Sequence, residues 1–369
     1  MTAYESPLIS ESQLRQAKRL LYMTHLAIGD FIYQGVWLKA LKAKYPHLEI
    51  DIWFDDCRKK PHSWAAGRNV TLGEWLETEG DFGELYPIVA NLAERENEIA
   101  RARARDYDLI VFIGKNRSEQ FAKVARQISS SAYIVAARSK PLANALAKWW
   151  HFNRLDAWYD FDRVSKETGR VTALYERSFG TVFGLTPEDT GGRQLLSTRV
   201  GQAYETAARE RIESFMGDDP RRIVFVNHLS TATKKDYPWP QVKAVLLALD
   251  QAHDDLAFIV NSPPDQYDDV ERHIAEDAEL ERLKIMASTA RDSFFELPAL
   301  MAECDVVISV DTATTHLAAS LDKPYVAIMA NDDKLWQPPG DGVILEGSGR
   351  AESVTPAAVV AAFESLASD

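Results

Sequence analysis

Residues 305–329 constrain the fold of this chain more than any other stretch; they read DVVISVDTATTHLAASLDKPYVAIM. Val306–Val310 is an apolar, mostly β-branched run, which is typical of a strand buried on both faces. His316–Leu321 has apolar residues at helical spacing, and after Pro324 a second buried strand begins at Tyr325–Met329. The sequence therefore predicts a strand, a polar loop, a helix and a strand in parallel α/β order.

The polar loop of this unit follows directly on the carboxyl end of the first strand. Open α/β sheets hold their ligands at that edge, and a helix N-terminus with unbonded N–H groups attracts anions. We therefore expect a phosphate or diphosphate to bind here. Helix capping is the alternative explanation, but it accounts less well for one Asp, three Thr and one His crowded into six positions. The predicted site residues are Asp311, Thr312, Ala313, Thr314, Thr315 and His316.

The order of these residues is similar to a known signature. Asp311-Thr312-Ala313, Thr315-His316 and Lys323-Pro324 together resemble the donor-binding motif of the bacterial heptosyltransferase family, glycosyltransferase family 9. Members of that family are inverting enzymes of GT-B architecture that move heptose from ADP-heptose onto the lipopolysaccharide core. The resemblance implies an α/β fold with two Rossmann-like domains, whose parallel sheets face each other across a cleft.

The amino-terminal residues extend the resemblance. Arg19–His25 predicts a strand, Gly29 a tight turn, Phe31–Tyr45 a helix, and Leu48–Phe54 a second strand. Gly29-Asp30 resembles the first loop of the family, which places a Gly-Asp pair before a helix. This implies that Asp30 is the catalytic base, which takes the proton from the acceptor hydroxyl as its oxygen attacks the anomeric carbon. Capping of the helix by Asp30 is the alternative.

A loop after the predicted strand Ile223–Asn227 supplies further donor contacts. Lys235-Asp236-Tyr237-Pro238 is similar to a K-x-W-P sequence in the family, which implies that Lys235 offsets the charge of the donor diphosphate. Lys234 is the alternative cation, and a solvated lysine pair is the alternative explanation. Gln266 stands where the family has a nucleoside-binding Glu, so the nucleotide and the sugar stay open. No metal and no cofactor are implied.

Basic residues of the amino-terminal half suggest an acceptor-binding side. Residues 1–170 carry 25 Lys and Arg against 22 Asp and Glu, whereas residues 171–369 carry 17 against 33. The net charge of −13 argues against a nucleic-acid binder, and the basic half suits an anionic glycan or glycolipid acceptor. Solvated basic loops are an equally good explanation. The acceptor candidates are Arg58, Lys60, Lys115, Asn116 and Arg117.

Several acidic residues are interpreted as structural or solvent-exposed. Asp55-Asp56 and Asp332-Asp333 are adjacent pairs that suit solvated loops. The Asp-x-Asp strings at residues 106–108 and 160–162 fall in the amino-terminal half, away from the predicted diphosphate. No metal site is therefore predicted.

The length of 369 residues suits two domains. We expect an acceptor domain over residues 1–190, a linker over 191–215, a nucleotide-sugar domain over 216–352, and a helix over 353–369 that packs across the joint. No apolar run approaches the roughly 18 residues of a membrane span, and no secretory signal is evident. The predicted location is the cytoplasm. The aromatic segment Leu146–Phe152 is compatible with peripheral contact at the inner membrane, although core packing is the favoured explanation.

The resemblance, which covers most of the chain, implies a metal-independent, inverting glycosyltransferase that moves heptose from ADP-heptose onto a lipopolysaccharide-core or related glycan, with Asp30 as the base. Two alternatives stay open. A GT-B nucleotide-sugar epimerase or hydrolase would share the fold and the diphosphate site but would need no acceptor surface. A non-catalytic sugar-nucleotide-binding scaffold would also share the fold, and the departures at Gln266, Ala313 and Ala330 are compatible with a drifted site.

Overall fold

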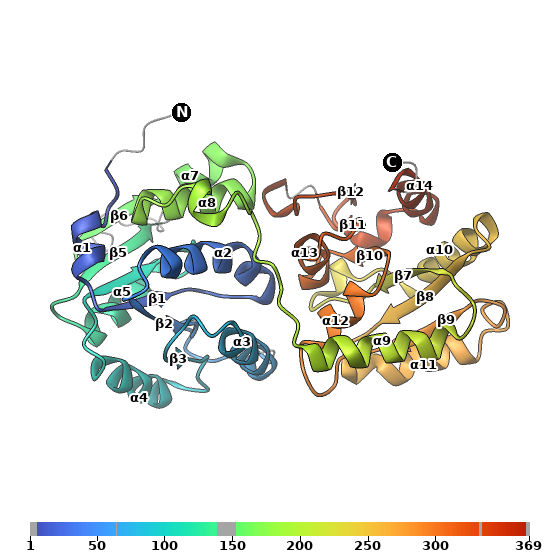
Figure 1. Cartoon of the computed structure of the whole chain (residues 1–369), viewed down its shortest axis with the longest axis horizontal. Helices are drawn as coiled ribbons and strands as arrows, with labels where there is room; N and C mark the ends of the chain where they lie inside the picture. Colours follow the sequence, from blue (N-terminus) through green and yellow to red (C-terminus); the bar gives the residue numbers. More distant parts are fainter. Residues whose placement is uncertain (1–5, 64, 139–152, 332–333, 367–369) are drawn as a thin grey trace. The chain divides into compact units, whose positions relative to one another are not determined.

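Two compact units make up the chain, one ending at Leu196 and one beginning at Ser197. The computed structural model describes residues 6–63, 65–138, 153–331 and 334–366. Each unit is built on a parallel sheet of its own (Figure 1). The segment Leu146–Phe152 and the pair Asp332-Asp333 lie outside the described residues. Among the described helices, none has both the length and the apolar character that crossing a bilayer requires.

The first unit has a six-stranded sheet, in its described part, with the strand order β3-β2-β1-β4-β5-β6. Strand β1 pairs with β2 on one side and with β4 on the other, so the direction of strand addition reverses there. Such a reversal is where open α/β sheets bind ligands. The strands are β1 (Arg19–Met23), β2 (Glu49–Trp53), β3 (Leu85–Tyr86), β4 (Leu109–Phe112), β5 (Tyr133–Arg138) and β6 (Ala157–Asp160). The helices are α1 (Glu11–Gln16), α2 (Ile28–Lys44), α3 (Ala65–Glu79), α4 (Leu92–Arg103), α5 (Ser118–Ile128), α7 (Phe161–Thr168) and α8 (Val171–Phe183).

Helices cover both faces of this sheet, which explains why its central strands are apolar throughout. Leu21 and Met23 of β1 pack with residues of α4 and α5. Tyr22 faces the other way and stacks on Phe179 of α8, with 5.9 Å between ring centroids; α2 packs beside α8 (Figure 1). A strand covered on both faces needs apolar residues at successive positions, and β1 and β4 meet that requirement.

The second unit repeats this arrangement with the order β12-β11-β10-β7-β8-β9. Counted from its own first strand, this is the order of the first unit, and the reversal lies between β7 and β10. The strands are β7 (Arg222–Asn227), β8 (Leu256–Asn261), β9 (Ile285–Ser288), β10 (Val306–Val310), β11 (Tyr325–Met329) and β12 (Gly342–Glu346). The helices are α9 (Gln202–Met216), α10 (Trp239–Ala252), α11 (Tyr267–Ala275), α12 (Glu296–Ala302), α13 (Ala313–Ser320) and α14 (Pro356–Leu366).

Two helices of the second unit fall in segments that the sequence assigned to a linker and to a domain joint. Helix α9 packs against α12. Helix α14 packs against α10 and against the strands β11 and β12. Both helices therefore contribute to the packing of the second unit.

The fold class predicted from the sequence is confirmed, because both sheets are parallel and flanked by helices. The strand, helix and strand within residues 305–329 are β10, α13 and β11. The tight turn predicted at Gly29 is wrong, since α2 begins at Ile28 and Gly29 lies within its first turn. The edge strands β3, β6, β9 and β12 were not predicted. They are short and only partly buried, so their sequences lack an apolar run.

Candidate functional site

The carboxyl end of β10 carries the residues predicted to bind the donor. Thr312 is the N-cap of α13, and its Oγ1 accepts a hydrogen bond from the Thr314 N–H at 3.3 Å. Lys235 Nζ lies 2.6 Å from Asp311 Oδ2. The structure thus brings the predicted cation, the predicted aspartate and the N-terminus of α13 to one edge of the sheet. Such an arrangement suits an anionic ligand.

Other predicted donor residues play different parts. Thr315 donates its hydroxyl to the Val310 carbonyl at 2.7 Å, so it closes the start of α13. Ala313 is the first residue of α13. Gln266 ends the 3₁₀ turn Pro264–Gln266 that follows β8, and precedes α11. Lys234 is exposed, in contrast to the ion-paired Lys235.

Two asparagines that were not predicted connect the ends of three strands. Asn261 Nδ2, on β8, donates to Asn227 Oδ1, on β7, at 2.9 Å. Asn227 Nδ2 lies 3.4 Å from Ser309 Oγ of β10 and 3.3 Å from Thr312 Oγ1. The network ties the N-cap of α13 to the sheet. Its only signal in the sequence is an amide residue that ends each of two apolar runs, RIVFVN and LAFIVN.

Three further buried polar atoms at this edge have no hydrogen-bond partner within the described residues: His228 Nε2, Ser262 Oγ and Thr289 Oγ1. They directly follow β7, β8 and β9, whose last residues are aligned in register, so the side chains share one face of the sheet. His228 Nδ1 donates to the Tyr237 carbonyl at 3.0 Å, which leaves Nε2 as an acceptor. Unpaired buried polar atoms are costly, and all three atoms lie beneath the surface of this edge of the sheet.

His316 is a neutral group at physiological pH. Its side chain is 8 % exposed, and burial lowers its pKa to about 4, with Asp311 opposing that shift and Lys235 adding to it. A neutral imidazole can both donate and accept hydrogen bonds. His316 is therefore suited to orient a ligand rather than to neutralise its charge.

Acidification from pH 7 to pH 4 is expected to lower the free energy of unfolding by about 3 kcal/mol through His316. The unfolded chain takes up a proton near an ordinary pKa of 6.5, whereas the folded chain does so only near 4. This stability is complete above pH 6.5 and is lost as the pH falls toward 4. Urea unfolding at both pH values measures it in the wild type and in His316→Gln, which should lose correspondingly less. Equal losses in the two proteins would contradict the expected shift.

In the first unit, Asp30 lies in the first turn of α2 rather than before the helix. Its Oδ2 accepts a hydrogen bond from the Ala27 N–H at 3.0 Å, which is the reach-back contact of a capping carboxylate. Burial raises the pKa of Asp30, while the Ala27 N–H, His25 and Arg68 oppose that rise. A carboxylate with a raised pKa is a better proton acceptor than an ordinary one.

A buried hydrogen-bond network fixes α2 one turn beyond Asp30. Gln34 Oε1 accepts from the hydroxyl groups of Tyr22, at 2.7 Å, and Thr24, at 3.0 Å. Gln34 Nε2 donates to the Tyr175 hydroxyl of α8 at 3.0 Å. The position of Asp30 is thereby set by β1 and α8 as well as by its own helix.

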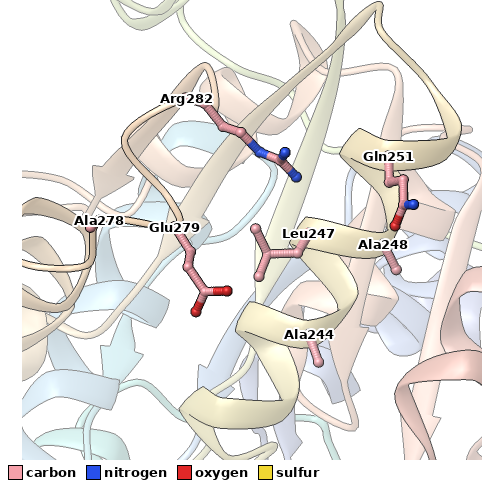
Figure 2. A pocket seen from close by; sticks show the side chains of 7 residues that line it. All are labelled: Ala244, Leu247, Ala248, Gln251, Ala278, Glu279 and Arg282. Atoms are coloured by element: carbon pink, nitrogen blue, oxygen red, sulfur yellow. The ribbon is translucent and has the colours of Figure 1, made fainter.

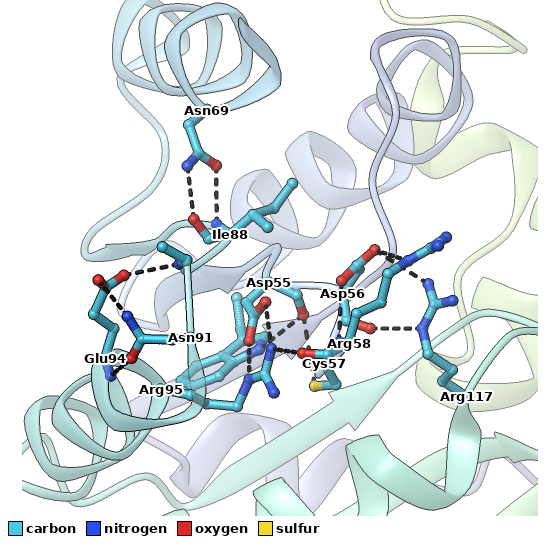
Figure 3. A network of polar contacts seen from close by, with 12 residues as sticks. Asp55, Asp56, Cys57, Arg58, Asn69, Ile88, Asn91, Glu94, Arg95 and Arg117 are labelled. Atoms are coloured by element: carbon cyan, nitrogen blue, oxygen red, sulfur yellow. Dashed lines mark hydrogen bonds and ion pairs between the residues drawn. The ribbon is translucent and has the colours of Figure 1, made fainter. Parts of the chain in front are cut away.

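The acidic pair Asp55-Asp56 is buried, so its interpretation as solvated loop charge was wrong. Asp55 is 0 % exposed and forms an ion pair with Arg95 of α4 (Figure 3). Asp56 is 1 % exposed and lies 2.5 Å from Arg58 Nε and 3.5 Å from Arg117 Nη2. Asp55 is paired with a residue 40 positions away, and Asp56 with one neighbouring and one distant arginine. No local pattern in the sequence indicates these pairings.

The five acceptor candidates separate into two groups. Arg58 and Arg117 meet at Asp56. Lys60, Lys115 and Asn116 are exposed, and Lys115 Nζ lies 3.6 Å from Asp162 Oδ1. The two arginines thus belong to an ordered cluster, whereas the other three residues lie on the surface of their loops.

A surface pocket of about 520 Å³ lies apart from these residues, between α10 and the loop that follows α11 (Figure 2). None of the predicted donor or acceptor residues lines it. In the described part of the chain, no three His, Cys, Asp or Glu side chains are grouped to hold a metal ion. The residues lining the pocket are Ala244, Leu247, Ala248, Gln251, Ala278, Glu279 and Arg282.

One comparison with known proteins concerns the carboxyl-terminal part of the chain. Residues 179–346, slightly under half of the chain, match the family model described as glycosyltransferase family 9 (heptosyltransferase). This span contains Lys235, Asp311 and His316. No curated protein sequence matches the chain.

Solved structures with a similar fold cover nearly the whole chain. A glycosyltransferase family 9 protein from Veillonella parvula is 17% identical, with a TM-score of 0.67 over 95% of this chain and 97% of that one. E. coli ADP-heptose lps heptosyltransferase II is 15% identical, with a TM-score of 0.65 over 94% and 98%. E. coli heptosyltransferase WaaC with ADP-2-deoxy-2-fluoro heptose is 17% identical, with a TM-score of 0.58 over 94% and 99%. At these identities the likeness is one of fold. Residues 179–346 thus match the family model of glycosyltransferase family 9, and the chain has the two-domain GT-B fold of the heptosyltransferases.

Proposed function

We propose that the chain is a glycosyltransferase, which moves a sugar, with inversion, from ADP-heptose onto a hydroxyl group of a lipopolysaccharide-core or related anionic glycan. The observation that carries the proposal is the Lys235–Asp311 ion pair beside the capped N-terminus of α13, within the span that matches the family model. The E. coli structures named for ADP-heptose and for an ADP-heptose analogue favour this donor.

The donor diphosphate is held at the start of α13. Backbone N–H groups of Thr312 and Ala313 supply hydrogen bonds, whereas the Thr314 N–H is engaged by Thr312 Oγ1. The helix N-terminus supplies partial positive charge. Lys235 turns its ammonium group from Asp311 toward the diphosphate. Charge that develops on the departing nucleoside diphosphate is offset there, while His316, as a neutral imidazole, orients the sugar or the phosphate.

Asp30 supplies the base. As the acceptor oxygen attacks the anomeric carbon, its proton passes to the Asp30 carboxylate, and the bond between that carbon and the diphosphate oxygen breaks. Attack from the side opposite the leaving group inverts the anomeric centre. The raised pKa of Asp30 increases its affinity for the proton, while Arg68 and His25 oppose that rise.

Anionic groups of the acceptor meet the basic residues of the first unit. Arg58 and Arg117 are the ordered pair and can bind phosphate or carboxylate oxygens through two N–H groups each. Lys60, Lys115 and Asn116 are exposed on the neighbouring loops and contribute outer contacts.

Replacement of Lys235 by Met is expected to weaken ADP binding about 10- to 100-fold, which corresponds to the loss of one charged hydrogen bond. The change also leaves Asp311 without this cation, so the carboxylate repels the diphosphate. Isothermal titration with ADP measures the effect. Lys234→Met, on the exposed neighbour, is the matched control and should change the affinity less than about twofold. Equal effects of the two substitutions would refute the assignment to Lys235.

The proposed function is tested by following ADP release from ADP-heptose with and without a heptose-deficient lipopolysaccharide core. Acceptor-dependent release together with a labelled product supports transfer. Release at the same rate without acceptor supports the hydrolase alternative. Binding of ADP-heptose without release supports the scaffold. Parallel titrations with UDP and GDP identify the nucleotide, because tighter binding of either would exclude an ADP-sugar donor.

A further inference from the structure

The loop after β2 contains a buried carboxylate that gathers basic side chains from three strand ends. Asp56 Oδ2 lies 2.5 Å from Arg58 Nε, 3.5 Å from Arg117 Nη2 and 3.7 Å from His25 Nε2. Arg58 follows β2, Arg117 follows β4 and His25 follows β1. Asp56 therefore stands at the reversal of strand order in the first sheet, which is the ligand-binding position of such a sheet.

Each arginine is held on the side that faces Asp56 and is partly exposed to solvent on the other side. Arg117 Nε donates to the Asp56 carbonyl at 2.6 Å, and the Arg58 N–H donates to Asp56 Oδ1 at 3.2 Å. The side chains of Arg58 and Arg117 are 29% and 22% exposed. Both guanidinium groups converge on the Asp56 carboxylate (Figure 3). This is the geometry of a preformed receptor rather than of two mobile surface chains.

The backbone around Asp56 is strained on both sides of the cluster. Cys57 has a φ of 57° and Arg117 a φ of 58°, which is the left-handed region that non-glycine residues avoid. Such strain persists only where the surroundings enforce it, and it is concentrated at functional sites. Here the buried Asp55–Arg95 pair lies beneath the turn, and Arg95 Nη2 donates to the Arg58 carbonyl at 2.6 Å.

The cluster carries excess positive charge next to the proposed base. Arg68 interacts electrostatically with both Asp30 and Asp56, and His25 does so as well. With Arg58 and Arg117, three arginines and one histidine face two carboxylates. The excess suits a ligand that brings one negative group to within reach of Asp30.

We infer that Asp56 is a positioning residue, which holds Arg58 and Arg117 as a receptor for one phosphate or carboxylate group of the substrate. That this substrate is the sugar acceptor rests on the proposed function, whereas the anion receptor itself does not. Asp56 acts through the arginines, because its own charge repels the group that they bind.

This inference predicts that removing the Asp56 charge weakens anion binding, whereas electrostatic repulsion alone predicts that it tightens binding. If Asp56 contributed only charge, its replacement by Asn would remove a repulsion and tighten anion binding. If Asp56 fixes the arginines, the same replacement releases the Arg58 guanidinium and the Arg117 Nη2 ion pair, while Arg117 Nε keeps its contact with the Asp56 carbonyl. Binding then weakens, because the released groups must be ordered on each binding event. The sign of the change separates the two explanations.

The test is a titration of the full chain with inorganic phosphate, and separately with acetate, at constant ionic strength and with ADP present to occupy the second unit. Asp56→Asn is expected to weaken binding of the preferred anion at least about tenfold, and Asp56→Glu to recover part of the loss. Arg117→Lys keeps the charge but replaces the planar guanidinium by an ammonium group. It should weaken anion binding by a similar factor. Asp156→Asn makes the same chemical change in a carboxylate of the same unit that is paired with Arg126, and it should leave anion binding unchanged.

Unchanged or tighter anion binding by Asp56→Asn would overturn the inference. Should that variant fail to fold, wild-type affinity in Arg117→Lys would overturn it equally, because both variants disrupt the fixed geometry. The proposed function is tested separately by Lys235→Met. This variant should lose ADP affinity, as stated above, and keep its response to phosphate. Anion binding that depends on Asp56 in a protein without transfer activity would support the receptor and refute the transferase.

Discussion

Asp30→Asn is expected to lower the rate constant of sugar transfer about 10²- to 10⁴-fold, the usual contribution of a general base. The amide cannot accept the proton of the acceptor hydroxyl, whereas its shape and its contact with the Ala27 N–H can be kept. Affinity for ADP should not change, because the predicted ADP contacts belong to the second unit. Transfer kinetics and ADP titration on the same preparation measure both quantities.

The pH profile gives a second measure of the same role. Only the ionised form of Asp30 is a base, so the wild-type rate should fall as the pH drops through the pKa of this group. Burial raises that pKa above the ordinary value of 3.8. The acidic limb of the profile, where the rate falls with falling pH, should therefore lie at a higher pH than it would for an exposed aspartate. The residual activity of Asp30→Asn should lack this limb.

A matched control is available in α4. Glu94 also lies in the first turn of its helix, and its Oε2 accepts a hydrogen bond from the Ala90 N–H at 2.8 Å. Glu94→Gln therefore tests whether loss of a capping carboxylate alone lowers the rate. A similar fall in both variants would assign Asp30 a structural role and remove it from the mechanism.

Arg95→Met is expected to lower the free energy of unfolding by about 3–5 kcal/mol, because it leaves the buried Asp55 carboxylate without its partner. At about 2–4 °C per kcal/mol for a unit of this size, the melting midpoint should fall by roughly 6–20 °C. Chemical denaturation and calorimetry of the wild type and the variant measure the change.

Two further variants show whether the loss comes from an unpaired charge. Asp55→Asn combined with Arg95→Met removes both charges and should be less damaging than Arg95→Met alone. Glu11→Gln breaks the exposed Glu11–Arg15 pair, which is open to solvent on both sides, and should cause no measurable change. A double variant as unstable as the single one would attribute the loss to packing.

The sequence predicted those parts of the molecule whose determinants are local. An apolar run of β-branched residues, a capping threonine and a proline after the helix are enough to specify β10, α13 and β11. The position of Asp311 and Thr312 at the end of a buried strand then determined which edge of the sheet they occupy. The assignment of Lys235 to the same site as Asp311 required the resemblance to a family, because the two residues are far apart in the chain, and their ion pair was not predicted.

Long-range pairing explains what the sequence could not reveal. Asp55 appeared to be loop charge because its cation, Arg95, comes from α4. Asp56 appeared so because Arg117 comes from the loop before α5, and because the neighbouring Arg58 carries no sign of burial in the sequence. Nothing local distinguishes a buried carboxylate with a distant arginine from a solvated one. The same holds for the amide of Asn227, whose partners come from β8 and β10.

The asparagine network also imposes a direction on hydrogen bonding at the N-cap of α13. Asn227 Nδ2 lies 3.2 Å from the Leu229 carbonyl, a group that can only accept, and this fixes which way the amide is turned. Thr312 Oγ1 accepts from the Thr314 N–H, and it is one of three oxygens within reach of the two hydrogens of Asn227 Nδ2. Both of these neighbours approach Thr312 as donors, so its hydroxyl hydrogen is left to donate. At the proposed diphosphate site, Thr312 would therefore favour an oxygen anion over an amine.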